Sequence, residues 1–216
     1  MSRPILGTRA EAYLGGRGII DLRGCGCLRF HPHCWYRADE DDPSATPEAF
    51  PALIASVRDK NGKLTGVHRT WLDPTGNHKA PVATPRRAMG ELLGHGVRFG
   101  QVDTVMITGE GLETVLSLRQ ILPAMPMIAA LSAAHLAALQ FPPTLRRLYI
   151  ARDNDDAGCH AAAALAARAQ GIGIEPLLLD AKLGDFNDDL RRIGGESMRA
   201  DVRVQLAPED AERFIG

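Results

Sequence analysis

The second half of the chain alternates short apolar runs with helix-forming segments, and this alternation restricts the fold more than any other feature. The apolar runs lie at 104–108, 126–130, 147–151 and 174–179. The helical segments between them lie at 112–122, 133–140 and 157–170. Strands separated by about ten to fifteen helical residues form βαβ units. The pattern therefore predicts an α/β fold with a parallel sheet flanked by helices.

The first half is irregular and rich in turn-forming residues. A short helix is expected within 10–18, ended by Gly15 or Gly16. A polar loop with several prolines is expected at 39–51. Residues 52–59 and 64–73, joined at an Asn-Gly-Lys turn, indicate a β-hairpin. The half therefore predicts a small α+β unit in front of the parallel sheet.

These patterns divide the chain into three parts. We expect an α+β subdomain at 1–100, an α/β domain at 101–190 and a C-terminal extension at 191–216. The extension is charged, and we expect a small strand and a terminal helix in it.

Composition sets limits on partners and location. The 216 residues carry a formal net charge of −1, which argues against a chain that coats nucleic acid electrostatically over its whole surface. Basic residues nevertheless gather within 58–98. No apolar run approaches the ~20 residues of a membrane span, and the N-terminus lacks the apolar core of a secretory signal. We expect a cytoplasmic protein without a membrane partner, whose four cysteines are reduced thiols.

Acidic residues follow the predicted strands. Glu110 comes directly after the first strand of the second half, and Asp153 and Asp155 follow the third. The carboxyl ends of parallel strands face the crevice where open α/β sheets bind ligands. Carboxylates that converge there repel each other unless a cation lies between them, and hard oxygen ligands favour Mg²⁺ or Mn²⁺ held partly by substrate phosphates. The pattern indicates a metal-dependent site for phosphate chemistry.

The acidic segments resemble the Toprim domain of bacterial primases, topoisomerases and some nucleases. The resemblance rests on the segments at 108–114, 152–158 and 185–189. It extends to a subgroup found in primases of phages, plasmids and integrated elements, through the stretches at 12–19, 67–80, 110–118, 129–139 and 185–190. It thus covers roughly residues 10–190 and implies a Toprim-like parallel sheet.

The resemblance implies primase-like nucleotidyl transfer, that is, primer synthesis from nucleoside triphosphates on a single-stranded DNA template. Glu110, Asp153 and Asp155 are the expected catalytic residues. The expected ligands of Mg²⁺ or Mn²⁺ are Glu110, Asp153, Asp155 and Asp185. Primases of this kind also carry a zinc-binding domain and often a helicase domain, so a separate zinc-binding or helicase protein is an expected partner.

The basic residues ahead of the acids are candidates for binding template or nucleotide phosphates. The candidates are His68, Arg69, Lys79 and Arg86. Strand alternation between 64 and 73 places Arg69 on the face of Trp71, and His68 on the face of Thr70. Trp71 and Tyr36 are either base-stacking residues or core aromatics.

Four questions remain open at the level of sequence. The same acids suit a metal-dependent Toprim nuclease, and the chain can also be a non-catalytic nucleic-acid-binding or partner module of a mobile element. Glu113 either joins the acidic cluster or occupies the first turn of its helix because of the helix dipole. The fourth is whether zinc binds a group whose spacing differs from the usual paired arrangement: Cys25, Cys27, His31, His33 and Cys34.

Overall fold

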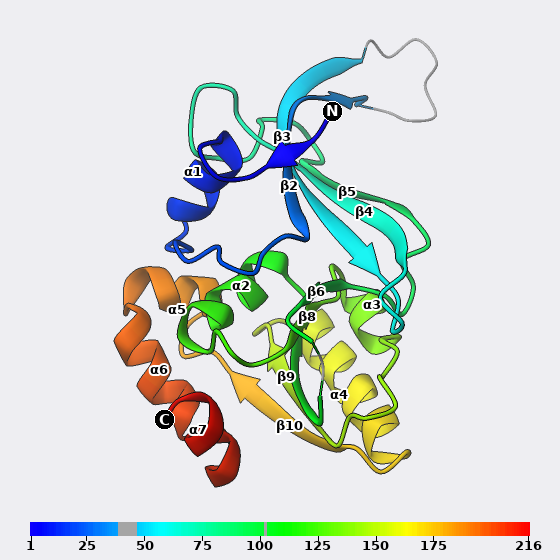
Figure 1. Ribbon diagram of the computed structural model, residues 1–216, viewed down its shortest axis with the longest axis vertical. Helices are drawn as coiled ribbons and strands as arrows, with labels where there is room; N and C mark the ends of the chain where they lie inside the picture. Colours follow the sequence, from blue (N-terminus) through cyan, green and yellow to red (C-terminus); the bar gives the residue numbers. More distant parts are fainter. Residues whose placement is uncertain (39–46, 102) are drawn as a thin grey trace.

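The computed structural model describes residues 1–38, 47–101 and 103–216, which form two β-sheets stacked along the long axis of the molecule (Figure 1). The N-terminal sheet has the strand order β1-β2-β3-β4-β5, and the C-terminal sheet has the order β10-β9-β7-β8-β6. The expected fold class, a parallel sheet flanked by helices and preceded by a small α+β unit, is confirmed.

The N-terminal sheet is antiparallel throughout. Its strands are β1 (Arg3–Pro4), β2 (Leu28–Tyr36), β3 (Glu48–Arg58), β4 (Leu64–Trp71) and β5 (Arg86–Gly90). Helix α1 (Arg9–Gly15) begins at Thr8, whose side chain accepts a hydrogen bond from the backbone of Ala10, and ends at Gly16 as expected.

The β3–β4 hairpin follows from its turn residues. One carboxylate oxygen of Asp59 accepts hydrogen bonds from the backbone N–H groups of Asn61 and Lys63, both at 2.9 Å. Gly62 has a φ of +84°, a conformation that residues with a Cβ rarely adopt. The hairpin predicted from the Asn-Gly pair is confirmed.

The C-terminal sheet contains four parallel strands and one antiparallel edge strand. The parallel strands are β7 (Val105–Gly109), β8 (Met127–Ala129), β9 (Arg147–Arg152) and β10 (Glu175–Asp180). The antiparallel strand β6 (Val97–Phe99) pairs with β8, so the second sheet already begins before residue 100.

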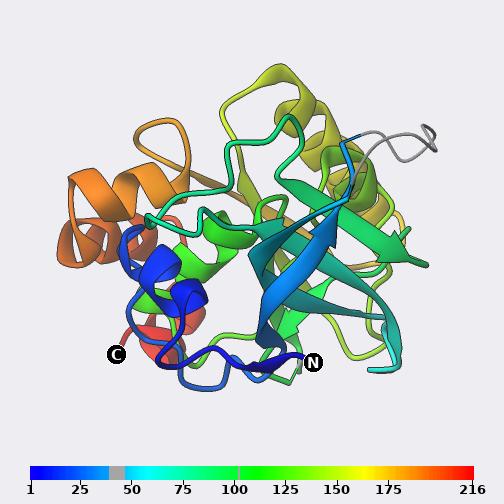
Figure 2. The same cartoon turned by 90° about the horizontal axis from the view of Figure 1, so that it is seen from above.

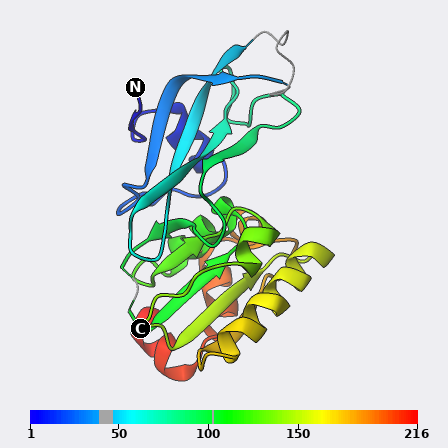
Figure 3. The same cartoon turned by 90° about the vertical axis from the view of Figure 1, so that its right-hand side faces the viewer.

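Helices cover both faces of this sheet, with α4 on one side and the pair α5 and α6 on the other (Figures 2 and 3). The helices are α2 (Leu112–Ile121), α3 (Ala133–Ala137), α4 (Asp156–Gln170), α5 (Phe186–Arg192), α6 (Gly195–Arg203) and α7 (Pro208–Phe214). One core lies between the sheet and the pair α3 and α4. A larger core surrounds α2 and continues into the N-terminal sheet through Leu28, Phe30 and Leu53. The two sheets therefore share apolar packing.

Two details differ from the sequence prediction. Strand β3 already starts at Glu48, within the expected loop at 39–51, of which residues 39–46 lie outside the described residues. The small strand expected after Arg191 was wrong, because α6 and α7 fill this part and bury Met198 and Val202 against the core. Among the described residues, no helix is long and apolar enough to cross a membrane.

Candidate active site

The four acids predicted from the sequence lie at one edge of the C-terminal sheet. Glu110 follows the last residue of β7, and Asp153 follows the last residue of β9. Asp155 is the N-cap of α4, and Asp185 is the N-cap of α5. The parallel strands bring these four positions together because their carboxyl ends meet at the same edge.

All four acids line one cleft of about 590 Å³, which we call the central cleft. Its acidic lining comes from the C-terminal sheet and its helices, and its basic lining comes mostly from the N-terminal half of the chain. The charged and imidazole side chains around it are Arg17, His68, Lys79, Arg86, Arg87, Glu110, Glu113, His135, Asp153, Asp155 and Asp185. Opposite charges thus face each other across one cavity.

The acids perturb one another. Burial raises the pKa of Asp153 to about 6, and the neighbouring carboxylates of Glu110, Asp185 and Asp155 add to the rise. Burial and the charge of Asp155 also raise the pKa of Glu110. The Oδ1 atom of Asp153 is buried and has no hydrogen-bond partner among the described residues. Crowded carboxylates with an unpartnered buried oxygen form a site that a cation would stabilise.

Two of the acids also have structural roles. Asp155 accepts a hydrogen bond from the backbone of Gly158 at 2.7 Å, and Asp185 accepts one from Asp188 at 2.7 Å. Each carboxylate uses Oδ1 to cap its helix, and neither Oδ2 has an assigned hydrogen bond within the described chain. Buried Asp189 holds the loop in front of Asp185 by accepting from the backbone of Lys182 and Leu183.

Of the four predicted phosphate-binding residues, the structure brings three to the central cleft. His68, Lys79 and Arg86 line it, whereas Arg69 lies on the opposite face of the N-terminal sheet, as strand alternation predicted. Burial lowers the pKa of His68 to about 4, so its ring is uncharged at neutral pH. Burial also lowers the pKa of Lys79, partly offset by the carboxylate of Glu113. The cationic side of the cleft therefore consists of lysine and arginine.

Glu113 contacts the basic side of the cleft and answers the question left open by the sequence. Tyr13 donates a hydrogen bond of 2.6 Å to it, and the nitrogen atoms of Lys79 and Arg86 lie 3.5 and 3.9 Å from its oxygens. Burial opposes its charge, but Lys79, the Tyr13 hydroxyl and Arg86 together lower its pKa to about 2. The two pKa shifts have different causes. Lys79, Tyr13 and Arg86 stabilise the charge of Glu113 and outweigh its burial, whereas the one carboxylate beside Lys79 does not outweigh the burial of the lysine. Glu113 is thus an ionised anchor for two cations.

Arg17 and Arg87 also line the central cleft; Arg87 belongs to the basic stretch expected to bind phosphates, whereas Arg17 was not singled out from the sequence. Arg17 lies 3.3 Å from the side-chain oxygen of Asn187, whose amide donates to the Arg17 carbonyl and to Ser117, both at 2.9 Å. Asn187 therefore joins the segment after α1 to α2 and α5. Arg17 lies within one of the stretches that carry the family resemblance, and this was the available signal.

The backbone beside Glu110 is strained. Leu131 has a φ of +80°, and no other non-glycine residue among those described has a positive φ. A bulky side chain rarely adopts this conformation, so such strain often marks functional sites. The Leu131 N–H donates to the Glu110 carbonyl at 2.7 Å, and a hydrogen bond from the Ala133 backbone to the Glu110 carboxyl offsets part of the rise in its pKa. The loop after β8 therefore fixes Glu110.

The described side chains do not form a complete metal site by themselves, since no three His, Cys, Asp or Glu residues among them gather as one ligand group. This applies to the acids and equally to the cysteine–histidine stretch near residue 30. Cys25 packs into the shared core, and burial raises the pKa of Cys27 to about 12. The donor chemistry of the four acids still fits Mg²⁺ or Mn²⁺, which commonly take remaining ligands from water and substrate phosphates.

The chain matches two domain families. Residues 105–196 match the Toprim domain, and residues 1–99 match a domain of unknown function, DUF7146. Among curated proteins, none matches this sequence.

Solved structures share the fold at low sequence identity. A DNA primase domain from Pseudomonas aeruginosa is 19% identical with a TM-score of 0.60, covering 93% of this chain and 72% of that one. A DnaG primase catalytic domain bound to single-stranded DNA is 17% identical with a TM-score of 0.61, covering 93% and 75%. The primase fragment of the bacteriophage T7 primase-helicase protein is 11% identical with a TM-score of 0.55, covering 82% of this chain and 66% of that fragment.

Proposed function

We propose that this chain, which carries a Toprim domain and shares its fold with primase catalytic domains, is a metal-dependent nucleotidyltransferase that synthesises primers on single-stranded DNA in the cytoplasm. The observation that supports this most directly is the central cleft, where an acidic edge faces a basic wall. Primer synthesis needs both, because cations bind a triphosphate while carboxylates hold metal ions and activate a hydroxyl.

We assign the metal to the acidic side of the cleft. Glu110, Asp153, Asp155 and Asp185 are the residues that would hold Mg²⁺ or Mn²⁺. When bound, such an ion neutralises triphosphate oxygens and lowers the pKa of an attacking hydroxyl. The unpartnered Oδ1 of Asp153 supports this assignment.

The protein's own groups do the remaining work in this proposal. Lys79 and Arg86 bind the triphosphate of the incoming nucleotide, and Glu113 keeps both directed into the cleft. Glu110, at the carboxyl end of β7 and in the lining of the cleft, either holds a metal ion or accepts the proton of the primer 3′-hydroxyl. His68 lies uncharged in the wall and contributes hydrogen bonding rather than charge.

Partners follow from the relatives. The T7 relative is a primase-helicase, and this chain spans 66% of its primase fragment. We propose that a separate helicase or zinc-binding protein works with this chain and helps it to select its template.

A single reaction separates the proposal from its rivals. Labelled nucleotides and labelled single-stranded DNA are incubated with Mg²⁺ or Mn²⁺ and the wild type, Glu110→Gln, Asp153→Asn or Asp156→Asn. Asp156 is the matched control, because it is exposed in the first turn of α4 and does not line the cleft.

New oligonucleotides from the wild type and Asp156→Asn, absent from the other two variants, are the expected result. Shortened DNA with the same variant pattern would show a Toprim nuclease instead. Tight DNA binding without either product, with and without a helicase partner, would show a non-catalytic module of a mobile element.

A further inference from the structure

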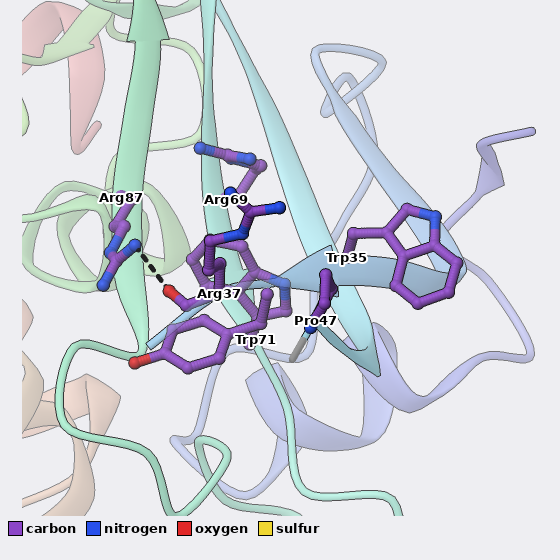
Figure 4. Close-up of a pocket in the computed structure, with 7 residues that line it drawn as sticks. Trp35, Arg37, Pro47, Arg69, Trp71 and Arg87 are labelled. Atoms are coloured by element: carbon purple, nitrogen blue, oxygen red, sulfur yellow. Dashed lines mark hydrogen bonds between the residues drawn. The ribbon is translucent and has the colours of Figure 1, made fainter. Parts of the chain in front are cut away.

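A second pocket lies on the face of the N-terminal sheet opposite the central cleft. It has a volume of about 500 Å³, and we call it the outer pocket (Figure 4). The residues that line it include Trp35, Tyr36, Arg37, Arg69, Trp71 and Arg87. In this view Arg87 and Trp35 lie at opposite ends, with Arg69 and Trp71 between them. No acidic side chain lines this pocket among the described residues.

The arginines are held against aromatic rings. The guanidinium of Arg69 lies 4.9 Å from the ring centroid of Trp71, and that of Arg87 lies 5.0 Å from the ring of Tyr36. Arg87 also donates to the carbonyls of Arg37 and Ala38 at 2.9 and 3.0 Å. Stacked and hydrogen-bonded arginines lose little further conformational freedom when they bind an anion.

Two features of the outer pocket indicate that it binds a ligand. The Nε atom of Arg69 is buried and has no hydrogen-bond partner within the described chain. The indole of Trp35 is 68% exposed, which is unusual for so large an apolar ring. A phosphate satisfies the first feature, and a nucleobase stacked on the indole satisfies the second.

The position of the outer pocket favours a continuous nucleic-acid chain over a free nucleotide as its ligand. Arg87 lines both the outer pocket and the central cleft, and it lies on β5, the edge strand of the N-terminal sheet. A single-stranded nucleic acid that leaves the central cleft can therefore cross this edge of the sheet and continue directly into the outer pocket.

We propose that the outer pocket binds a base and the adjoining phosphates of single-stranded nucleic acid, with Trp35 stacking on the base and Arg69 holding a phosphate. The proposal rests on the proposed function only for the choice of DNA, the template, over RNA. It adds a template contact outside the catalytic cleft and assigns to Arg69 the phosphate contact predicted from the sequence.

The chain carries its own reporter for this site. It has two tryptophans, and both line the outer pocket. Intrinsic tryptophan fluorescence of the full chain, titrated with a short oligo(dT) in the absence of nucleotide and divalent metal, therefore reports binding there. The test compares wild type, Trp35→Ala and Arg69→Gln with the matched control Leu64→Ala, which removes an exposed apolar side chain elsewhere on β4.

We expect oligo(dT) to quench the fluorescence of wild type and Leu64→Ala. Fluorescence anisotropy of the labelled oligonucleotide should show about fivefold or greater loss of affinity in Trp35→Ala, the range that base stacking allows. Arg69→Gln should weaken binding and reduce the slope of affinity against salt concentration by about one. An abasic oligomer of the same length should bind wild type no better than Trp35→Ala binds oligo(dT).

Unchanged fluorescence with wild type, or equal affinity in all variants, would overturn the proposal. So would quenching by an acidic, aromatic peptide at concentrations where oligo(dT) has no effect, because this would indicate a protein partner. Thermal melting checks that each variant is folded. Primer synthesis is measured in a separate assay. If the wild type makes no primers but oligo(dT) still quenches its tryptophan fluorescence, only the proposed catalytic function is contradicted.

Discussion

At the scale of single residues, Asp153 has a strongly raised pKa in the central cleft. Its carboxyl has a pKa of about 6 in the folded protein, against 3.8 for the isolated group, because of burial and three neighbouring acids. The folded chain therefore holds this proton more tightly than the unfolded chain. It follows that the contribution of Asp153 to stability decreases as pH rises from about 4 to about 6.

Asp153→Asn should therefore be more stable than wild type when no divalent metal is present. After allowance for solvent screening, the gain at pH 7 should be about 1 kcal/mol, or a rise in Tm of about 2–4 °C. Differential scanning calorimetry at pH 7 and pH 4 tests this, and the difference should shrink at pH 4. Asp156→Asn serves as control, and a variant that melts below wild type at pH 7 would refute the interpretation.

Glu113 should show the opposite dependence on pH. Its pKa in the folded protein is about 2, below the ordinary 4.5, so its contribution is complete above about pH 5 and is lost as pH falls towards 2. Glu113→Gln leaves Lys79 buried beside a neutral group, which should cost about 3 kcal/mol at neutral pH. Urea unfolding between pH 7 and pH 3 should show a flatter pH profile in the variant.

The control for this series is Glu196→Gln, which changes an exposed acid in the first turn of α6. It should follow the wild-type profile. A Glu113→Gln variant that lost as much stability in acid as the wild type would contradict the interpretation that ionised Glu113 holds Lys79 and Arg86.

At the scale of elements, the turn between β9 and α4 has no room for a larger residue. A Cβ on Gly158 would lie 2.9 Å from the backbone oxygen of Asp153 and 3.2 Å from Oδ1 of Asp155. This turn places two acids of the cleft, so its tight packing fixes where they point.

Gly158→Ala should therefore displace the turn, cost about 1–3 kcal/mol of stability and sharply reduce any metal-dependent activity. Gly171→Ala, at the end of the same helix, meets no atom closer than 3.4 Å and is the control. Thermal unfolding and the primer assay measure both effects. Equal stability and activity of the two variants would mean that the turn adapts freely.

At this scale, much of the fold and part of the candidate site could be predicted from the sequence. The strands, helices and acidic edge follow from local apolar periodicity and from the rule that parallel strands end together, so Glu110, Asp153 and Asp155 could be placed without a structure. Glu113 as an anchor for Lys79 and Arg86 could not, because those contacts depend on how the N-terminal sheet packs over α2. The terminal helix was expected, but α6 was predicted as a small strand because its charged residues hide the few apolar positions that pack on the core.

At the scale of the whole molecule, the shared core should make the two sheets unfold together. Core residues around α2 continue into the N-terminal sheet, and Asn187 hydrogen-bonds across the same boundary. Both tryptophans belong to strands of the N-terminal sheet, whereas every described helix except α1 follows residue 100. Two optical signals can therefore follow the two parts separately.

Tryptophan fluorescence and far-ultraviolet circular dichroism should give coincident unfolding curves in urea. Asn187→Ala should lower the midpoint of both signals together, by about 1–3 kcal/mol for the lost buried hydrogen bonds. Asn154→Ala, which removes an exposed side chain, is the control. Two separate transitions in the wild type would show that the sheets are independent units.

The capping bonds of Asp155 and Asp185 have a consequence for the heat sensitivity of the site. Each carboxylate starts a helix with one oxygen and, in the proposed function, offers the other to an ion. Order in the first helical turn and retention of the ion are then reciprocally linked. Warming that frays these turns should weaken ion binding well below the temperature at which the two sheets unfold, so activity should be lost before the fold is.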